Sequence, residues 1–194
     1  MKFYIPLILF LFSQSSFGQL RSIGKPRPFT KKEEMMDSAN KHCIHRYKFP
    51  LTQRLTNFPF NKTKEVRVVS FGEKKNSMGN EIPKKRNQVN LSKLKESITL
   101  NAIQIDSLSD IIYNTGYKGI FYSFEEGCYI PRNAILFIDS TGRVFEYIEL
   151  CFQCGGYKIS LKKVKAGEFC LEKYSLLELF FKKAGIKYGI EMTD

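Results

Sequence analysis

Three of the five cysteines in this 194-residue chain bracket one short segment. Cys128 precedes a run of apolar residues, and Cys151 and Cys154 form a C-x-x-C after a second run. The intervening residues 139–142 (Asp-Ser-Thr-Gly) are typical of a type I turn with a glycine bulge, so we expect a β-hairpin over about 134–150. Such a hairpin gathers three thiols at one end, where they can form a disulfide, bind a metal or exchange electrons.

A structural disulfide is the first interpretation of these cysteines, because an exported protein meets an oxidising compartment. Counting outward from the turn, Phe137 faces Phe145, and the same register brings Cys128 opposite Cys154. Cys151 then points to the other face of its strand. A Cys128–Cys154 bond closes a loop of about 26 residues and stabilises the fold by roughly 3 kcal/mol on the chain-entropy model.

Two alternatives for the cysteines remain open. Cys128, Cys151, Cys154 and Cys170 supply the ligand count of a tetrahedral zinc site, although a strong zinc signal has two C-x-x-C knuckles and this chain has one. The C-x-x-C can also be redox-active. Such pairs usually begin a helix, whose dipole lowers the thiol pKa, whereas the residues from Gly155 onward predict a turn and a strand.

Hydrolytic chemistry has weaker support in the sequence. His42 and His45 are the two histidines, and both flank Cys43 within a predicted helix over about 31–46. A nucleophile and base inside one helical turn have poor geometry for attack on a substrate. The G-x-S-x-G, H-E-x-x-H and P-loop patterns are missing, which argues against an enzyme without excluding one.

Arg132 is the residue whose chemistry best suits binding. It follows Pro131 where an aromatic loop enters the hairpin, and a guanidinium binds a carboxylate or phosphate through two parallel hydrogen bonds. Together with Tyr129 and Asn133 it forms the candidate binding set. The alternative is an internal ion pair with a nearby glutamate (Glu125, Glu126 or Glu149) that pins the loop.

Local signals predict the elements that must position these residues. Thr30 and Glu33 form a capping box for the first helix, with Met36, Ala39, Cys43 and Tyr47 along one face. Further expected elements are a strand over 65–72, a polar loop over 73–87, one extended segment within 88–100, a helix from Asn101 to a left-handed Gly116, a strand over 157–161, and a helix from Leu171 that ends at Gly185. This order favours an α+β domain in which about three helices pack an antiparallel or mixed sheet around the central hairpin.

The N-terminus predicts export. Lys2 is followed by an apolar run over 4–12 and by small residues at Ser16 and Gly18, so residues 1–18 are typical of a cleaved signal peptide. The run is shorter than the roughly 20 residues that span a bilayer. We therefore expect an extended arm over 19–29, a single domain over 30–194, no transmembrane segment after cleavage, and a secreted or periplasmic location.

The net charge of +12 is unevenly distributed. Residues 19–95 hold 19 lysines and arginines against six acidic residues, whereas residues 96–194 hold 11 against 13. A basic half suits an anionic envelope surface or an acidic protein partner, with the basic loop 73–87 and the aromatic loop 117–129 as the expected contacts. Its scattered basic pairs lack interleaved aromatics, which argues against nucleic acid, and a solvated loop is the simpler alternative.

Three runs carry a resemblance to a group of proteins. They are C-Y-x-P-R-N-A-I-x-F-x-D from Cys128, C-F-x-C from Cys151, and C-x-E-K…L-x-x-F-F…G-I-x-Y-G from Cys170. This C-terminal half resembles small exported proteins of Gram-negative bacteria. The resemblance implies a shared exported domain and brings no activity with it. Such proteins often carry histidine where this chain has Asn133, so no acid–base role is implied at that position.

Taken together, the sequence favours an exported, non-enzymatic envelope protein that binds or inhibits a partner and needs no cofactor. The alternative is a cysteine-centred redox or zinc protein that uses Cys151 and Cys154.

We predict that the exported product begins at Gln19. Intact-mass measurement of the protein recovered from outside the cytoplasm tests this, and a mass that includes residues 1–18 would contradict it.

Overall fold

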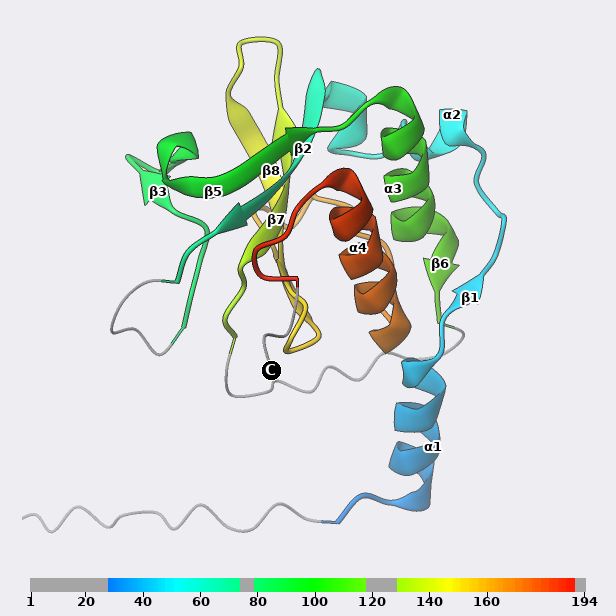
Figure 1. Cartoon of the computed structure of the whole chain (residues 1–194). Coiled ribbons are helices and arrows are strands. Elements are labelled where there is room, and N and C mark those ends of the chain that lie inside the picture. The colour runs from blue at the N-terminus through cyan, green and yellow to red at the C-terminus, as the bar shows by residue number, and fades with distance from the viewer. Residues whose placement is uncertain (1–27, 74–78, 118–128, 191–194) are drawn as a thin grey trace, which may run out of the picture.

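The computed structural model describes residues 28–73, 79–117 and 129–190. Its main element is an antiparallel sheet in the order β5-β2-β7-β8-β9 (Figure 1). These strands are β5 (Leu94–Thr99), β2 (Glu65–Phe71), β7 (Asn133–Ile138), β8 (Val144–Cys151) and β9 (Gly156–Ile159). Two small ladders pair β1 (Ile44–His45) with β6 (Thr115–Gly116) and β3 (Lys84–Lys85) with β4 (Gln88–Val89).

Helices complete the fold and confirm the α+β class. They are α1 (Lys31–Lys41), the single turn α2 (Leu51–Arg54), α3 (Ala102–Asn114) and α4 (Leu171–Ala184), with 3-10 turns η1 (Phe60–Lys62) and η2 (Leu91–Lys93). α3 and α4 pack on one face of the sheet, whereas α1 extends away from it (Figure 1). Among the described residues, no helix combines the length and apolar character needed to cross a bilayer.

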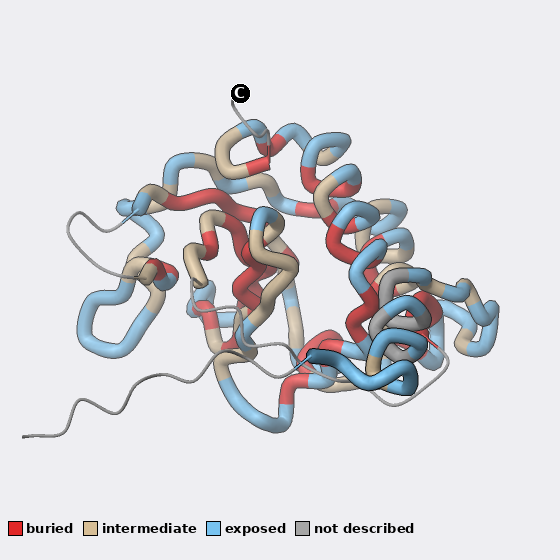
Figure 2. Tube along the Cα trace, turned by 90° about the horizontal axis from the view of Figure 1, so that it is seen from below, coloured by how far each residue is buried: buried red, intermediate tan, exposed pale blue. Residues whose placement is uncertain are grey.

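The central strand β7 is buried along its whole length, as Figure 2 shows for the strands at the middle of the sheet. Ile135 and Phe137 point into the larger apolar cluster with α3 and α4. Leu136 and Ile138 point into a second cluster with Ile82 from the segment before β3. The predicted hairpin is therefore central and covered on both sides, because both of its faces are apolar.

Local capping signals were good predictors of helix ends. Thr30 and Glu33 form the predicted capping box at α1. Asn101, the predicted start of the next helix, forms a capping box with Gln104 at α3, with reciprocal 2.9 Å hydrogen bonds. Gly185 ends α4 in the left-handed conformation, with φ of 106°.

The first helix is shorter than predicted. α1 ends at Lys41, and His42 is extended. Residues 44–45 pair with β6, and the Arg46 N–H donates to the Asn114 carbonyl at 2.8 Å. The expected helical positions of Cys43 and Tyr47 are therefore wrong, because pairing with a distant segment replaces the local helical hydrogen bonds.

The structure gives the glycine at position 116 a different role from the predicted helix cap. Gly116 lies in β6 opposite Ile44 rather than in a left-handed cap after α3. A Cβ at this position would lie 2.6 Å from the Glu168 Oε2 atom, so the glycine allows a close approach of Glu168.

The β7–β8 register agrees with the prediction only next to the turn. Gly142 is left-handed and Ile138 faces Val144. The register then shifts by one residue, so Phe137 faces Glu146 and the predicted Phe137–Phe145 pair is wrong. A bulge adds one residue to one strand, and a hairpin with two apolar faces gives no pattern that reveals it.

Truncating the centre of the core tests this packing. Phe137 is fully buried and meets the Phe60 ring edge-on at a centroid distance of 5.1 Å. We expect Phe137→Ala to lower the free energy of unfolding by about 3–5 kcal/mol, measured by urea denaturation. Ile103→Ala, at a side chain that is 79% exposed, is the matched control and should change it by less than about 0.5 kcal/mol. Similar losses in both variants would contradict the assigned core.

Candidate functional site

Four cysteines form two disulfides, Cys43–Cys170 and Cys151–Cys154. Cys128 lies outside the described residues. The predicted Cys128–Cys154 bond is wrong, because Cys154 is bonded to Cys151. Cys151 is the last residue of β8 and faces Gly156, so the C-x-x-C is the turn between β8 and β9. The prediction extended the β7–β8 ladder past a point where the chain reverses.

The predicted zinc set is not assembled. Its members Cys151, Cys154 and Cys170 are held in disulfides, whereas a zinc ligand must be a thiolate. Elsewhere in the described part of the chain, no group of three or more Cys, His, Asp or Glu residues is placed to hold a metal ion.

The two disulfides differ in what they contribute to folding. Cys43–Cys170 joins residues 127 apart in sequence and ties the chain after α1 to the start of α4. On the chain-entropy model this loop is worth about 5 kcal/mol, against about 1.5 kcal/mol for the short loop of Cys151–Cys154. The Cys43–Cys170 bond is therefore structural. The Cys151–Cys154 bond contributes little to the stability of the fold, so its presence calls for another explanation.

Sequence reasoning missed Cys43 as a disulfide partner, because it placed this residue on a helix. One signal was present: pairing the adjacent cysteines Cys151 and Cys154 with each other frees Cys170 to bond with Cys43.

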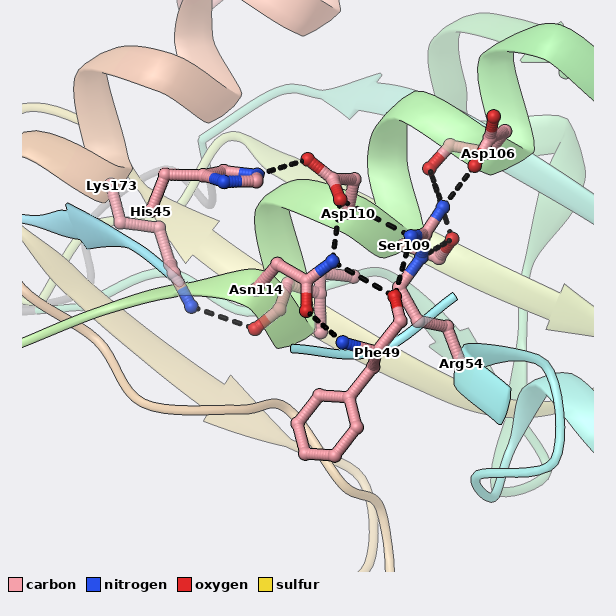
Figure 3. Close-up of polar contacts among 9 residues, drawn as sticks. His45, Phe49, Arg54, Asp106, Ser109, Asp110, Asn114 and Lys173 are labelled. Atoms are coloured by element: carbon pink, nitrogen blue, oxygen red, sulfur yellow. Dashed lines mark hydrogen bonds and ion pairs between the residues drawn. The ribbon is translucent and has the colours of Figure 1, made fainter. Parts of the chain in front are cut away.

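A cluster of polar side chains lies between α2 and α3 (Figure 3). The buried Arg54 guanidinium donates from Nε to Ser109 Oγ at 3.1 Å and from Nη1 to the Phe49 carbonyl at 2.9 Å. It also pairs with the carboxylates of Asp106 and Asp110, which lie one helical turn apart on α3. Every nitrogen of this guanidinium has a partner within the protein, so Arg54 fastens α2 to α3.

His45 extends this cluster toward solvent. Its Nε2 lies 2.6 Å from Asp110 Oδ2, and the Tyr47 ring packs against it. Burial alone would raise the pKa of Asp110, but hydrogen bonds from His45 and Asn114 bring it below its usual range. A histidine–aspartate pair is the base of a hydrolytic triad, yet His45 Nδ1 is buried and no described residue hydrogen-bonds to it. The pair therefore lacks a nucleophile in this part of the chain.

Lys173 lies fully buried on α4 and donates from Nζ to the Ile112 carbonyl at 2.8 Å (Figure 3). Burial lowers the pKa of this amine to about 7. A neutral lysine is a nucleophile, but this one has no exposed surface. Sequence reasoning missed it, although a lysine four residues before Leu177 falls on the apolar stripe of the helix.

Arg132 makes an internal ion pair, but with an unexpected partner. Its Nε donates to Glu73 Oε1 at 2.7 Å, and its Nη2 contacts the same oxygen. Of the predicted partners, Glu149 accepts a hydrogen bond from the Ile82 N–H at 2.6 Å, and Glu125 and Glu126 lie outside the described residues.

Asn133 holds the C-terminal segment. It is fully buried and donates from Nδ2 to the Tyr188 carbonyl at 3.0 Å. Its Oδ1 has no hydrogen-bond partner among the described residues. A Cβ on the left-handed Gly189 would lie 2.7 Å from that oxygen, so the segment packs closely against this amide.

Tyr129 is the one predicted binding residue that lies beside the C-x-x-C. Its ring packs on Gly156, where an added Cβ would lie 3.2 Å from ring carbons. The Lys158 Nζ lies 4.3 Å from the ring centroid, and the Tyr129 hydroxyl is buried without a described hydrogen-bond partner. Burial, reinforced by the charge of Glu149, raises the pKa of this hydroxyl.

Glu149 completes this group. It precedes Cys151 by two residues on β8, so both side chains point to the same face of the sheet. Its side chain is buried, and burial raises the pKa of its carboxyl. A buried carboxyl whose pKa is raised, a buried tyrosine hydroxyl and a disulfide thus lie near the β8–β9 turn, which we take as the candidate site.

Comparisons with protein-family models, with curated proteins and with solved structures found no match to this chain. The resemblance to exported Gram-negative proteins therefore stays a prediction, and function has to be inferred from the residues themselves.

Lys173 should make stability depend on pH. The unfolded lysine keeps its proton up to about pH 10.5, whereas the folded one releases it near 7. Between these values the unfolded chain binds more protons, so the free energy of unfolding rises with pH and falls as pH drops toward 7. We expect a gain of roughly 2 kcal/mol from about pH 7.5 to 9, measured by urea unfolding without reductant.

The Lys173→Met variant should lose this rise of the free energy of unfolding with pH. Lys183→Met, at an exposed position of the same helix, should keep it. An unchanged pH dependence in Lys173→Met would contradict the assignment.

Proposed function

We propose that this protein is an exported, non-enzymatic binding module that docks on an anionic surface of the cell envelope through the tip of the β3–β4 hairpin. The observation that carries this proposal is the pair of exposed cations at that tip, Lys85 and Arg86.

The backbone of the hairpin fixes the position of these charges. Lys84 faces Val89 and Lys85 faces Gln88, so Arg86 and Asn87 form a two-residue turn. Both turn residues have positive φ, 52° and 60°, as a type I′ turn requires. The turn therefore presents its cations from a defined backbone.

The tip cations are available to a partner. Lys84 lies 3.8 Å from Glu81, but neither Lys85 nor Arg86 has an ion pair with a described residue. The exposed Lys93 and the part-exposed Leu91 follow in η2, beside the hairpin (Figure 1). Cations next to an apolar side chain suit the interface of an anionic membrane, where each cation contributes about 1 kcal/mol. Three such cations support binding that is reversible and sensitive to salt.

Export is supported by the disulfides and by the charge distribution. Two intramolecular disulfides are consistent with an oxidising compartment. The N-terminal half of the chain, which includes the hairpin, carries the excess of basic residues. The expected contact loops 73–87 and 117–129 lie partly outside the described residues, and the first strand and the turn of the hairpin belong to the described part of the first loop.

Vesicle binding tests the proposal. The protein from Gln19 onward should sediment with vesicles of phosphatidylglycerol and phosphatidylcholine at low salt, and not with phosphatidylcholine alone. Raising the salt should release it, since ions screen exposed charges over about 10 Å at 0.1 M. The double variant Lys85→Glu/Arg86→Glu should bind at least about 10-fold more weakly.

The control is Lys31→Glu/Lys32→Glu, which changes the net charge equally on α1, far from the hairpin (Figure 1). Equal weakening by both double variants would overturn the hairpin as the contact. Failure of the wild-type protein to bind either vesicle would overturn the membrane proposal, and retention on immobilised polyglutamate would then indicate an acidic protein partner.

A further inference from the structure

The two sulfurs of the β8–β9 turn differ in access. Cys151 is 2% exposed, whereas Cys154 is only partly buried. An incoming thiolate therefore meets the Cys154 sulfur first. On the Gly156 side the Tyr129 ring packs beside this sulfur, because a Cβ on Gly156 would lie 3.2 Å from ring carbons and 3.5 Å from Cys154 Sγ.

Opening this bond would disturb little of the fold. It joins residues three apart within one turn, whereas the Cys43–Cys170 bond ties two distant segments. The β7–β8 ladder and the second cluster contain no residue of the turn over 152–155, and Phe152 is its one side chain packed against the larger cluster.

The less accessible sulfur needs a proton when the bond breaks. A buried thiolate is costly without a cation or a proton donor. Glu149 lies on the same face of β8, with its Cα about 7 Å from that of Cys151. Four groups from other elements face this carboxyl, namely Lys84 of β3, Lys158 of β9, Glu81 and Tyr129. Burial outweighs the two lysines, so the carboxyl keeps its proton to a higher pH than an ordinary glutamate.

We propose that Cys151–Cys154 is a redox-active disulfide that exchanges with an external dithiol, and that Glu149 supplies the proton to the Cys151 sulfur. This inference does not rest on the binding of the hairpin to an anionic surface.

The exchange proceeds in two steps. A thiolate of the external dithiol attacks Cys154 Sγ, a mixed disulfide forms, and the electron pair of the broken S–S bond leaves on Cys151, which takes the proton of Glu149. The second thiol of the dithiol then attacks the mixed disulfide and releases the Cys154 sulfur, which takes up a proton. The dithiol is oxidised to its disulfide, Cys151 and Cys154 are reduced to thiols, and Glu149 regains its proton from solvent.

Timed reduction of the folded, oxidised protein by dithiothreitol tests the first part. Samples are quenched with acid, freed of dithiothreitol and then alkylated with excess iodoacetamide at mildly alkaline pH, and alkylated peptides are identified by mass spectrometry. Cys151–Cys154 should open at a rate proportional to dithiothreitol concentration and at least 10-fold faster than Cys43–Cys170, with an unchanged circular dichroism spectrum. Opening of both bonds together, at a rate independent of dithiothreitol, would mean that reduction follows global unfolding and would overturn the proposal.

The pH dependence tests Glu149. Expressed per dithiothreitol thiolate, the wild-type rate constant should fall as pH rises through the pKa of Glu149, above the usual 4.5. Glu149→Gln should lose this fall. Glu146→Gln is the matched control, since Glu146 is also buried on β8. Its side chain shares a face of the sheet with Phe137, the face opposite to that of Glu149.

A fall that persists in Glu149→Gln would overturn the role of Glu149. If that variant does not fold, the wild-type profile still decides, because a flat profile would exclude a titrating proton donor.

Discussion

Burial of β7 on both faces requires the polar groups of the neighbouring strands to find partners inside the protein. β8 carries two buried glutamates, one on each face. Glu146 accepts from Ser160 Oγ at 2.5 Å, and Glu149 accepts from the Ile82 N–H at 2.6 Å. β7 is covered on both faces, whereas the edge strand β5 exposes alternate residues, so a partner has access to the ends and edges of the sheet rather than to its middle. The β3–β4 hairpin and the β8–β9 turn occupy two such places, which is why the proposed chemistry lies there.

The same constraint explains why residue types that are often catalytic, such as histidine and aspartate, have structural roles here. α3 packs its apolar side on the sheet, and its remaining surface receives the segment that follows α1. Arg54 and His45 both bind Asp110 there, and Asn114 donates to the Phe49 carbonyl at 3.0 Å. The cluster therefore holds the segment after α1 against α3, beside the β1–β6 pairing that replaces the hydrogen bonds of a longer helix.

Local signals allowed much of the fold to be predicted, because capping and turn chemistry depend on a few neighbouring residues. The capping boxes, the left-handed Gly185 and the turn of the central hairpin are of this kind. The bulge opposite Phe137 lies in a hairpin whose two faces are both apolar, so no pattern reveals it, and the Cys43–Cys170 bond joins residues far apart in sequence. Of the candidate site, the sequence indicated the C-x-x-C and Tyr129, whereas it named Glu149 only as a partner of Arg132, because the burial of Glu149 follows from the tertiary packing.

The Cys43–Cys170 bond closes most of the domain into a covalent ring. Any single peptide bond cut between these two cysteines leaves both pieces attached to each other through sulfur. The ring includes all five strands of the main sheet, so a protease that cuts one peptide bond within it converts a circular chain into a linear one without releasing a fragment. The strands then remain tethered at high effective concentration. The cut domain keeps its fold until a reductant cleaves the Cys43–Cys170 bond.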